Sequence, residues 1–176
     1  DLDGSLRHTN GILTMAMLAR QEKMESIFVP SIDAEEAAVI SGLNVYPVDS
    51  LLSLFRHLMG TEKIAPAPQK IFSEIEESKS YEFDFEDIVG QEQAKRAIEV
   101  AVAGGHNMYM QGPPGAGKTM LARAISSIMP RLTEEEAVEV TKIYSITGNL
   151  PLGQSLMTYR PFRAPHHTTS RIGLIG

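Results

Sequence analysis

Helix-like and strand-like stretches alternate in the first part of the chain. Apolar side chains recur at helical spacing over residues 12–24, and a short apolar run at 27–29 indicates a buried strand. Asp33 and Glu36 have the spacing of a capping box, which predicts a helix that runs to Ser41.

The same alternation continues to residue 60. Residues 45–48 predict a second short strand, and Asp49 is placed to cap an apolar helix that runs through Leu58. Short alternating units of this kind are typical of an α/β layer. We therefore interpret residues 1–60 as part of an α/β domain.

Residues 61–82 have the composition of a linker. They contain Pro66 and Pro68, and a polar run follows at 73–80. Proline-rich and charged segments tend to be extended and solvated. We expect a solvated tether here.

A second α/β pattern begins at residue 83 and is interpreted as a domain over residues 83–176. Helical spacing covers residues 91–103, and Met108-Tyr109-Met110 predicts a short strand. A further helix is predicted over 118–129. Thr133 with Glu136 forms another capping box, which starts the next helix.

Composition narrows the possible functions. The absence of cysteine excludes disulfides, thiolate metal sites and a cysteine nucleophile, and it fits a reducing cytoplasm. No apolar run reaches the roughly 20 residues that a membrane-spanning helix needs. The net charge is −6, yet no acidic residue follows Glu139, so the last part of the chain is basic and could attract polyanions. The chain begins without a methionine, which suggests a fragment.

The most informative motif fits the phosphate-binding pattern GxxxxGK[ST]. It comprises Gly112, Pro113, Pro114, Gly115, Ala116, Gly117, Lys118 and Thr119. The glycines permit turns in which successive N–H groups face phosphate oxygens. Lys118 supplies a positive charge for the phosphates, and the Thr119 hydroxyl is a suitable ligand for Mg²⁺. A predicted strand before the motif and a helix after it match what this mechanism requires, so we expect binding of ATP with Mg²⁺.

Hydrolysis needs a further group. An acidic residue on a second strand usually holds the metal and positions water. No acid follows Glu139, so we expect the chain to stop before that strand. We therefore identify no catalytic residue within these 176 residues, and we expect the isolated chain to bind nucleotide weakly and to hydrolyse it negligibly.

Several motifs together resemble the magnesium-chelatase-like AAA+ ATPases of the ComM/YifB type. Besides the phosphate-binding loop, the motifs are Asp87-Ile88-Val89-Gly90-Gln91-Glu92, Ala103-Gly104-Gly105-His106-Asn107 and Arg160-Pro161-Phe162-Arg163-Ala164-Pro165-His166-His167-Thr168. The resemblance implies a partial Lon-like domain (ribosomal S5 domain 2-like, α/β) over 1–60. It also implies a partial P-loop NTPase (AAA+) αβα domain over 83–176, truncated before the Walker B strand.

The Lon-like part is not expected to be a peptidase. In Lon proteases a catalytic lysine follows a Gly-Gly-Leu turn, and Thr14 stands at the matching place after Gly11-Ile12-Leu13. The partner serine would lie before Asp1. Since a Ser–Lys protease needs both groups, we reject peptidase activity for this chain.

The resemblance also implies roles for residues and partners. Ile88 and Val89 would lie near the adenine, and the Walker B acid, the sensor and the arginine finger would lie beyond Gly176. Intact members form hexameric rings, and ComM-type members act as DNA motors in branch migration. Two rivals stay open: the ATPase subunit of a true metal chelatase, and a nucleotide-gated assembly module that does no work on DNA.

The basic segment from Arg160 to Arg171 is a further candidate. Arg160, Arg163, His166 and His167 could contact DNA phosphates or a neighbouring subunit. Metal binding by the two histidines is disfavoured, because no other ligand lies nearby in the sequence.

Overall fold

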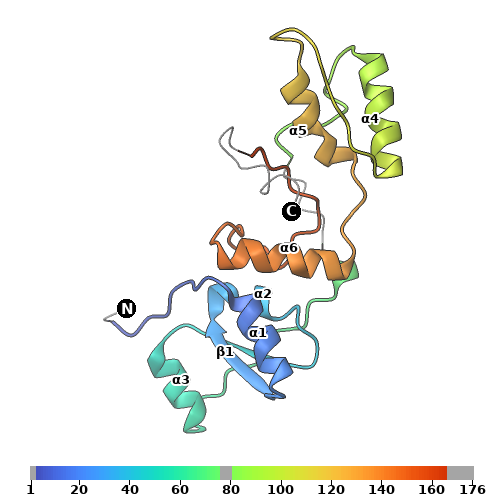
Figure 1. The fold of residues 1–176 in the computed structure, drawn as a ribbon. Helices are drawn as coiled ribbons and strands as arrows, with labels where there is room; N and C mark the ends of the chain where they lie inside the picture. The colour runs from blue at the N-terminus through green and yellow to red at the C-terminus, as the bar shows by residue number, and fades with distance from the viewer. Residues whose placement is uncertain (1–2, 76–80, 166–176) are drawn as a thin grey trace. The chain divides into compact units, whose positions relative to one another are not determined.

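The computed structural model describes residues 3–75 and 81–165, and the chain divides into two compact units. The first unit contains Asp1–Ser78 together with Leu132–Thr158, and the second contains Lys79–Arg131 together with Tyr159–Gly176. Helices and a small parallel sheet are both present, so the predicted α/β class is confirmed (Figure 1). The order of a Lon-like domain followed by an AAA+ module, with its boundaries at 60 and 83, stays a prediction.

The first unit is built around two parallel strands. β1 (Ser26–Pro30) pairs with β2 (Asn44–Val48) from Ser26 opposite Asn44 to Pro30 opposite Val48. The crossover between them consists of η1 (Ser31–Asp33) and α2 (Ala34–Ala37). α1 (Ile12–Gln21) packs against the strands and the crossover. Their shared core contains Ile12, Ala16, Val29, Ala34, Ala37 and Val45.

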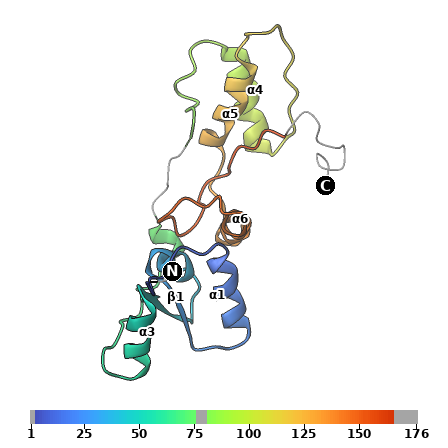
Figure 2. The ribbon, with the colours of Figure 1, turned by 90° about the vertical axis from the view of Figure 1, so that its left-hand side faces the viewer.

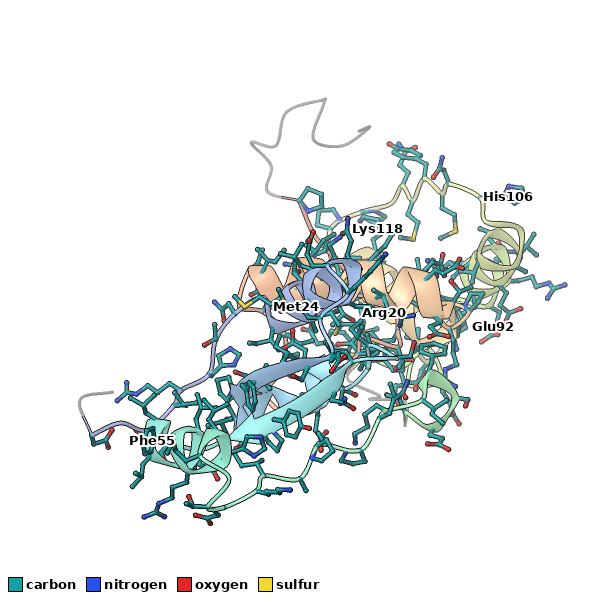
Figure 3. The ribbon with its side chains drawn as sticks, turned by 90° about the horizontal axis from the view of Figure 1, so that it is seen from below. Arg20, Met24, Phe55, Glu92, His106 and Lys118 are labelled. Carbon is teal, nitrogen blue, oxygen red and sulfur yellow. The ribbon has the colours of Figure 1, made fainter. Side chains whose placement is uncertain are left out.

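Aromatic side chains contact α3 (Leu51–Leu58). Phe28 of β1 stacks on Tyr46 of β2 with ring centroids 5.1 Å apart, and His57 of α3 contacts both rings. The helix begins at Ser50, whose hydroxyl accepts a hydrogen bond from the Ser53 amide. The predicted cap at Asp49 is therefore wrong by one residue. The other face of α3 is exposed, and Figure 3 labels Phe55 there, with 59% of its surface accessible.

α6 (Glu134–Ile146) packs against α1 in the first unit (Figures 1 and 2). Val138 of α6 contacts a core formed by Leu13, Val39 and Leu156. The segment after α6 returns along it, and the Met157 amide donates to the Thr141 hydroxyl at 2.8 Å. The sequence correctly predicted the Thr133–Glu136 capping box of this helix. It did not predict that the helix packs with residues that precede residue 79.

Part of the predicted linker is not a solvated tether. The Ala67 amide donates to the Val45 carbonyl at 2.7 Å, and the Lys70 amide donates to the Ala38 carbonyl at 3.1 Å. A short η2 (Phe72–Glu74) follows, and Phe72 packs against the core around Leu13. The prolines and charges had indicated a linker, and they gave no sign that its backbone would hydrogen-bond to β2 and to the residue that ends α2.

The second unit holds α4 (Glu92–Gly104) and α5 (Lys118–Ile128), which pack side by side (Figure 1). Their core is formed by Phe85, Ile88, Ile98, Leu121 and Ala124. Met108–Met110 was predicted as a strand, but it has no ladder partner among residues 81–131 and 159–165 and is irregular. A strand is defined by pairing, so an apolar run without a neighbouring strand does not become one.

Candidate phosphate-binding site

The loop at 112–119 is shaped by left-handed backbone at two glycines. Gly115 has φ 80° and Gly117 has φ 77°, a region that residues with a side chain rarely adopt. A Cβ built on either residue meets no atom within 4 Å, so conformation and not crowding requires glycine there. Gly112 is different, because its φ is not positive and a Cβ would make only ordinary contacts. The expectation that all three glycines relieve forbidden turns thus holds for two of them.

Gly117 connects the loop directly to α5. It is the N-cap residue of the helix, and its carbonyl accepts the Leu121 amide at 2.9 Å. The first amides of a helix have no partner within the helix and carry the positive end of its dipole. Thr119 lies in this first turn and is exposed. The local sequence therefore places free amides, a hydroxyl and a lysine together.

Lys118 folds back over the loop. Its Nζ donates to the Gly112 carbonyl at 2.8 Å and to the Pro113 carbonyl at 2.7 Å. Both acceptors are neutral, so the ammonium charge is not compensated by these contacts. An anion in the loop could interact with this charge directly.

A cavity of about 510 Å³ adjoins the loop. Its walls come from the start of α4, from residues 108–113 and from the start of α5. Figure 3 labels Lys118 at the start of α5 and Glu92 at the start of α4. The volume is within the range of cavities that hold small-molecule ligands. Gln91 lines it with a left-handed φ of 59°, a strained conformation for a residue with a side chain.

Ile88 and Val89 do not line this cavity. Ile88 is 3% exposed and belongs to the core beneath α4 and α5, whereas Val89 is 94% exposed. Their assignment to the adenine stays a prediction. The cavity lining instead includes Gln91 and Tyr109 beside the loop 112–119, although the sequence had indicated Gln91 only as part of a family motif and Tyr109 only as part of a strand.

A second cavity of about 510 Å³ lies at the other end of α4. Arg163 and Phe162 line it together with His106. α4 ends in two hydrogen bonds, from the Gly105 amide to the Val102 carbonyl and from the His106 amide to the Ala101 carbonyl. A Cβ on Gly104 would lie 2.5 Å from the His106 ring, so the glycine makes room for this histidine.

The basic segment is only partly described. Arg160 is half-buried and Arg163 is exposed, while His166, His167 and Arg171 lie outside the described residues. Within residues 3–75 and 81–165, no group of three side chains that could together hold a metal ion is present. Over the same residues, no helix is long and apolar enough to cross a membrane.

Comparison with known proteins places the chain in a family. Residues 84–176 match the family described as magnesium chelatase, subunit ChlI. The chain is 38% identical over 176 residues to the competence protein ComM of Haemophilus influenzae, covering 99% of this chain and 34% of that protein. The chain belongs to the magnesium-chelatase-like family of ComM and YifB. This family is a group of AAA+-type ATPases, so the resemblance inferred from the motifs is confirmed.

Other family members and a protease share parts of the sequence. The uncharacterized YifB of Escherichia coli is 36% identical over 176 residues, covering 99% of this chain and 33% of that protein. The archaeal Lon protease of Methanothermobacter thermautotrophicus is 39% identical over 73 residues, covering 39% of this chain and 11% of the protease. The Lon match is partial and shows no peptidase. The chain spans about a third of the length of the family members that it matches.

Proposed function

We propose that the loop 112–119 binds the phosphates of ATP. The observation that carries this proposal is the combination of two left-handed glycines, a helix that begins at the loop and a lysine whose ammonium contacts only neutral carbonyls. Phosphate binding at a helix N-terminus follows from the orientation of the free amides and the helix dipole. The adjoining cavity has room for the remainder of a nucleotide.

The residues fit the group that the family implies. A Cβ built on Gly115 or Gly117 meets no atom within 4 Å, so the space beside both residues is open for phosphate oxygens. Lys118 would exchange its contacts with the Gly112 and Pro113 carbonyls for contacts with the phosphates. Thr119 would supply a hydroxyl ligand for Mg²⁺, which offsets phosphate charge when bound.

In the intact protein, hydrolysis of the bound ATP would drive mechanical work. We favour a hexameric motor that acts on DNA, because the family includes a competence protein and because the basic residues Arg160 and Arg163 follow the ATP-binding loop. Such residues could contact DNA phosphates or the next subunit. A chelatase ATPase subunit is the alternative, favoured by the name of the matched family, and an assembly module without DNA work is another.

The test compares full-length protein with two lysine variants. Lys118→Ala should abolish ATP binding and ATP-dependent branch migration while the protein stays folded. Lys95→Ala removes a lysine from α4 that does not line the cavity, and it should leave both properties unchanged. ATP binding that survives Lys118→Ala would refute the assignment of the loop. ATP-dependent activity without any DNA requirement would instead favour one of the alternatives.

A further inference from the structure

Two buried carboxylates, Asp33 and Glu36, make contacts outside α2, the helix that they were expected to cap. Asp33 is 3% exposed and Glu36 is 6% exposed. Asp33 makes no capping bond; its Oδ2 accepts the Thr9 amide at 2.9 Å and its Oδ1 contacts His8 Nδ1 at 2.5 Å. The predicted capping box is therefore wrong, and both acids are used for tertiary contacts.

Glu36 joins two helices that are distant in sequence. Its Oε1 accepts the Leu13 amide at 2.8 Å, in the first turn of α1, and the Ser145 hydroxyl at 2.6 Å, in the last turn of α6. The Ser145 hydroxyl in turn accepts the Gly11 amide at 2.9 Å. Each of these polar groups is buried and has its hydrogen bond, so the contact is specific and not merely apolar.

Shape supports the same contact. A Cβ on Gly148, just beyond α6, would lie 2.8 Å from Asn10 Nδ2. Asn10 is held in place by His8, whose Nε2 lies 2.9 Å from Asn10 Oδ1. A Cβ on Gly11 would contact Ile146 at 3.7 Å. The loop at 8–11 thus fits closely against the end of α6.

The two partners come from different parts of the sequence. The loop and the carboxylates precede residue 84, whereas α6 lies within the residues that match the chelatase family. We propose that residues 8–13 with Asp33 and Glu36 form an internal docking site for the C-terminal end of α6. The segment before residue 84 would then hold α6, a helix that lies within the residues 84–176 matched by the family. Thr14, which the resemblance to Lon proteases aligns with their catalytic lysine, lies in α1. The N-terminus of this helix forms part of the docking site.

The experiment uses two glycines that differ in one respect. Gly148 and Gly60 both follow a helix and have φ of 67° and 75°, so alanine is strained at either. Only at Gly148 does the added methyl meet another group, since nothing lies within 4 Å at Gly60. Amide hydrogen exchange of the whole chain would be compared for Gly148→Ala, Gly60→Ala, Asn10→Ala and the double variant Asn10→Ala/Gly148→Ala.

We expect Gly148→Ala to raise exchange of the Gly11 amide and of the last turn of α6 more than Gly60→Ala does, because the added methyl must displace the Asn10 side chain from its contact with His8. Asn10→Ala in the Gly148→Ala background should remove most of that excess, and amides of α4 and α5 should be unaffected. Equal effects of Gly148→Ala and Gly60→Ala would overturn the proposal. So would an excess that persists when Asn10 is absent. Lys118→Ala should not change any of these rates, so this test is independent of nucleotide binding.

Discussion

The contribution of Glu36 to stability can be worked out from its contacts. Replacing Glu36 by alanine removes the acceptor for the Leu13 amide and for the Ser145 hydroxyl, both in buried surroundings. A buried donor left without its partner costs about 1–3 kcal/mol. With two such donors we expect a total loss of roughly 2–4 kcal/mol. The upper limit is below the full sum because Ser145 still accepts the Gly11 amide and its hydroxyl can in part reorient.

A neighbouring glutamate provides the matched control. Glu35 is 56% exposed at its side chain, and its ion pair with Lys70 has an N···O distance of 3.4 Å. An exposed pair of this kind contributes about 0–1 kcal/mol, so Glu35→Ala should change stability little. Glu36→Gln should be intermediate, because an amide oxygen can accept the same bonds without the charge.

The assay is urea unfolding followed through amide signals of β1 and β2, which report on the first unit alone. With a slope of about 1–3 kcal/mol per molar urea, a loss of this size lowers the midpoint by roughly 0.7–4 M. Glu36→Ala and Glu35→Ala with the same midpoint would refute the reasoning. That result would mean that water replaces the Glu36 carboxylate with no loss of folding free energy. The contact of Glu36 with Leu13 and Ser145 would then not be buried in solution.

Four further substitutions test other contacts. The hydrogen bond to the Asp33 carboxylate raises the pKa of His8 above its ordinary value of 6.5. The stabilisation from this pair is therefore complete below pH about 6.5 and is lost as the pH rises through the raised pKa. His8→Gln should flatten the resulting fall in urea midpoint above pH about 6.5, and an unchanged fall in the variant would contradict a role of this pair. Ser50→Ala and Thr133→Ala each remove a capping hydroxyl and should cost about 1 kcal/mol in urea unfolding, with no loss in either variant excluding the assigned caps. Leu121→Ala should destabilise the second unit by about 2–5 kcal/mol, seen as faster exchange in α4 and α5 but not in α1, and uniform exchange across both units would contradict separate cores.

Local features of the fold follow well from the sequence. The predicted helices over 12–24, 91–103 and 118–129 all appear within a few residues, because each combines apolar periodicity with a clear end signal. The left-handed turns at Gly115 and Gly117 are also predictable, since a glycine in this loop pattern reports its backbone conformation directly, whereas phosphate binding by the loop stays a prediction. Met108–Met110 was not, because a strand depends on a partner that a local pattern cannot reveal.

The failure at Asp33 and Glu36 has a different cause. An acid at a helix start followed by an acid three residues later satisfies both a capping box and a tertiary acceptor pair, and the two arrangements use the same residue types. The burial of the acids decides between them: Asp33 bonds with His8 and Thr9, and Glu36 bonds with Ser145 of α6, which lies about 100 residues later in the chain. Thr133 and Glu136 show the contrast: neither residue is buried, and their two capping hydrogen bonds form as the local pattern predicts. A capping pattern is therefore informative where its acids stay at the surface. Where its acids are buried, as at Asp33 and Glu36, it points instead to a long-range contact that must be found in the structure.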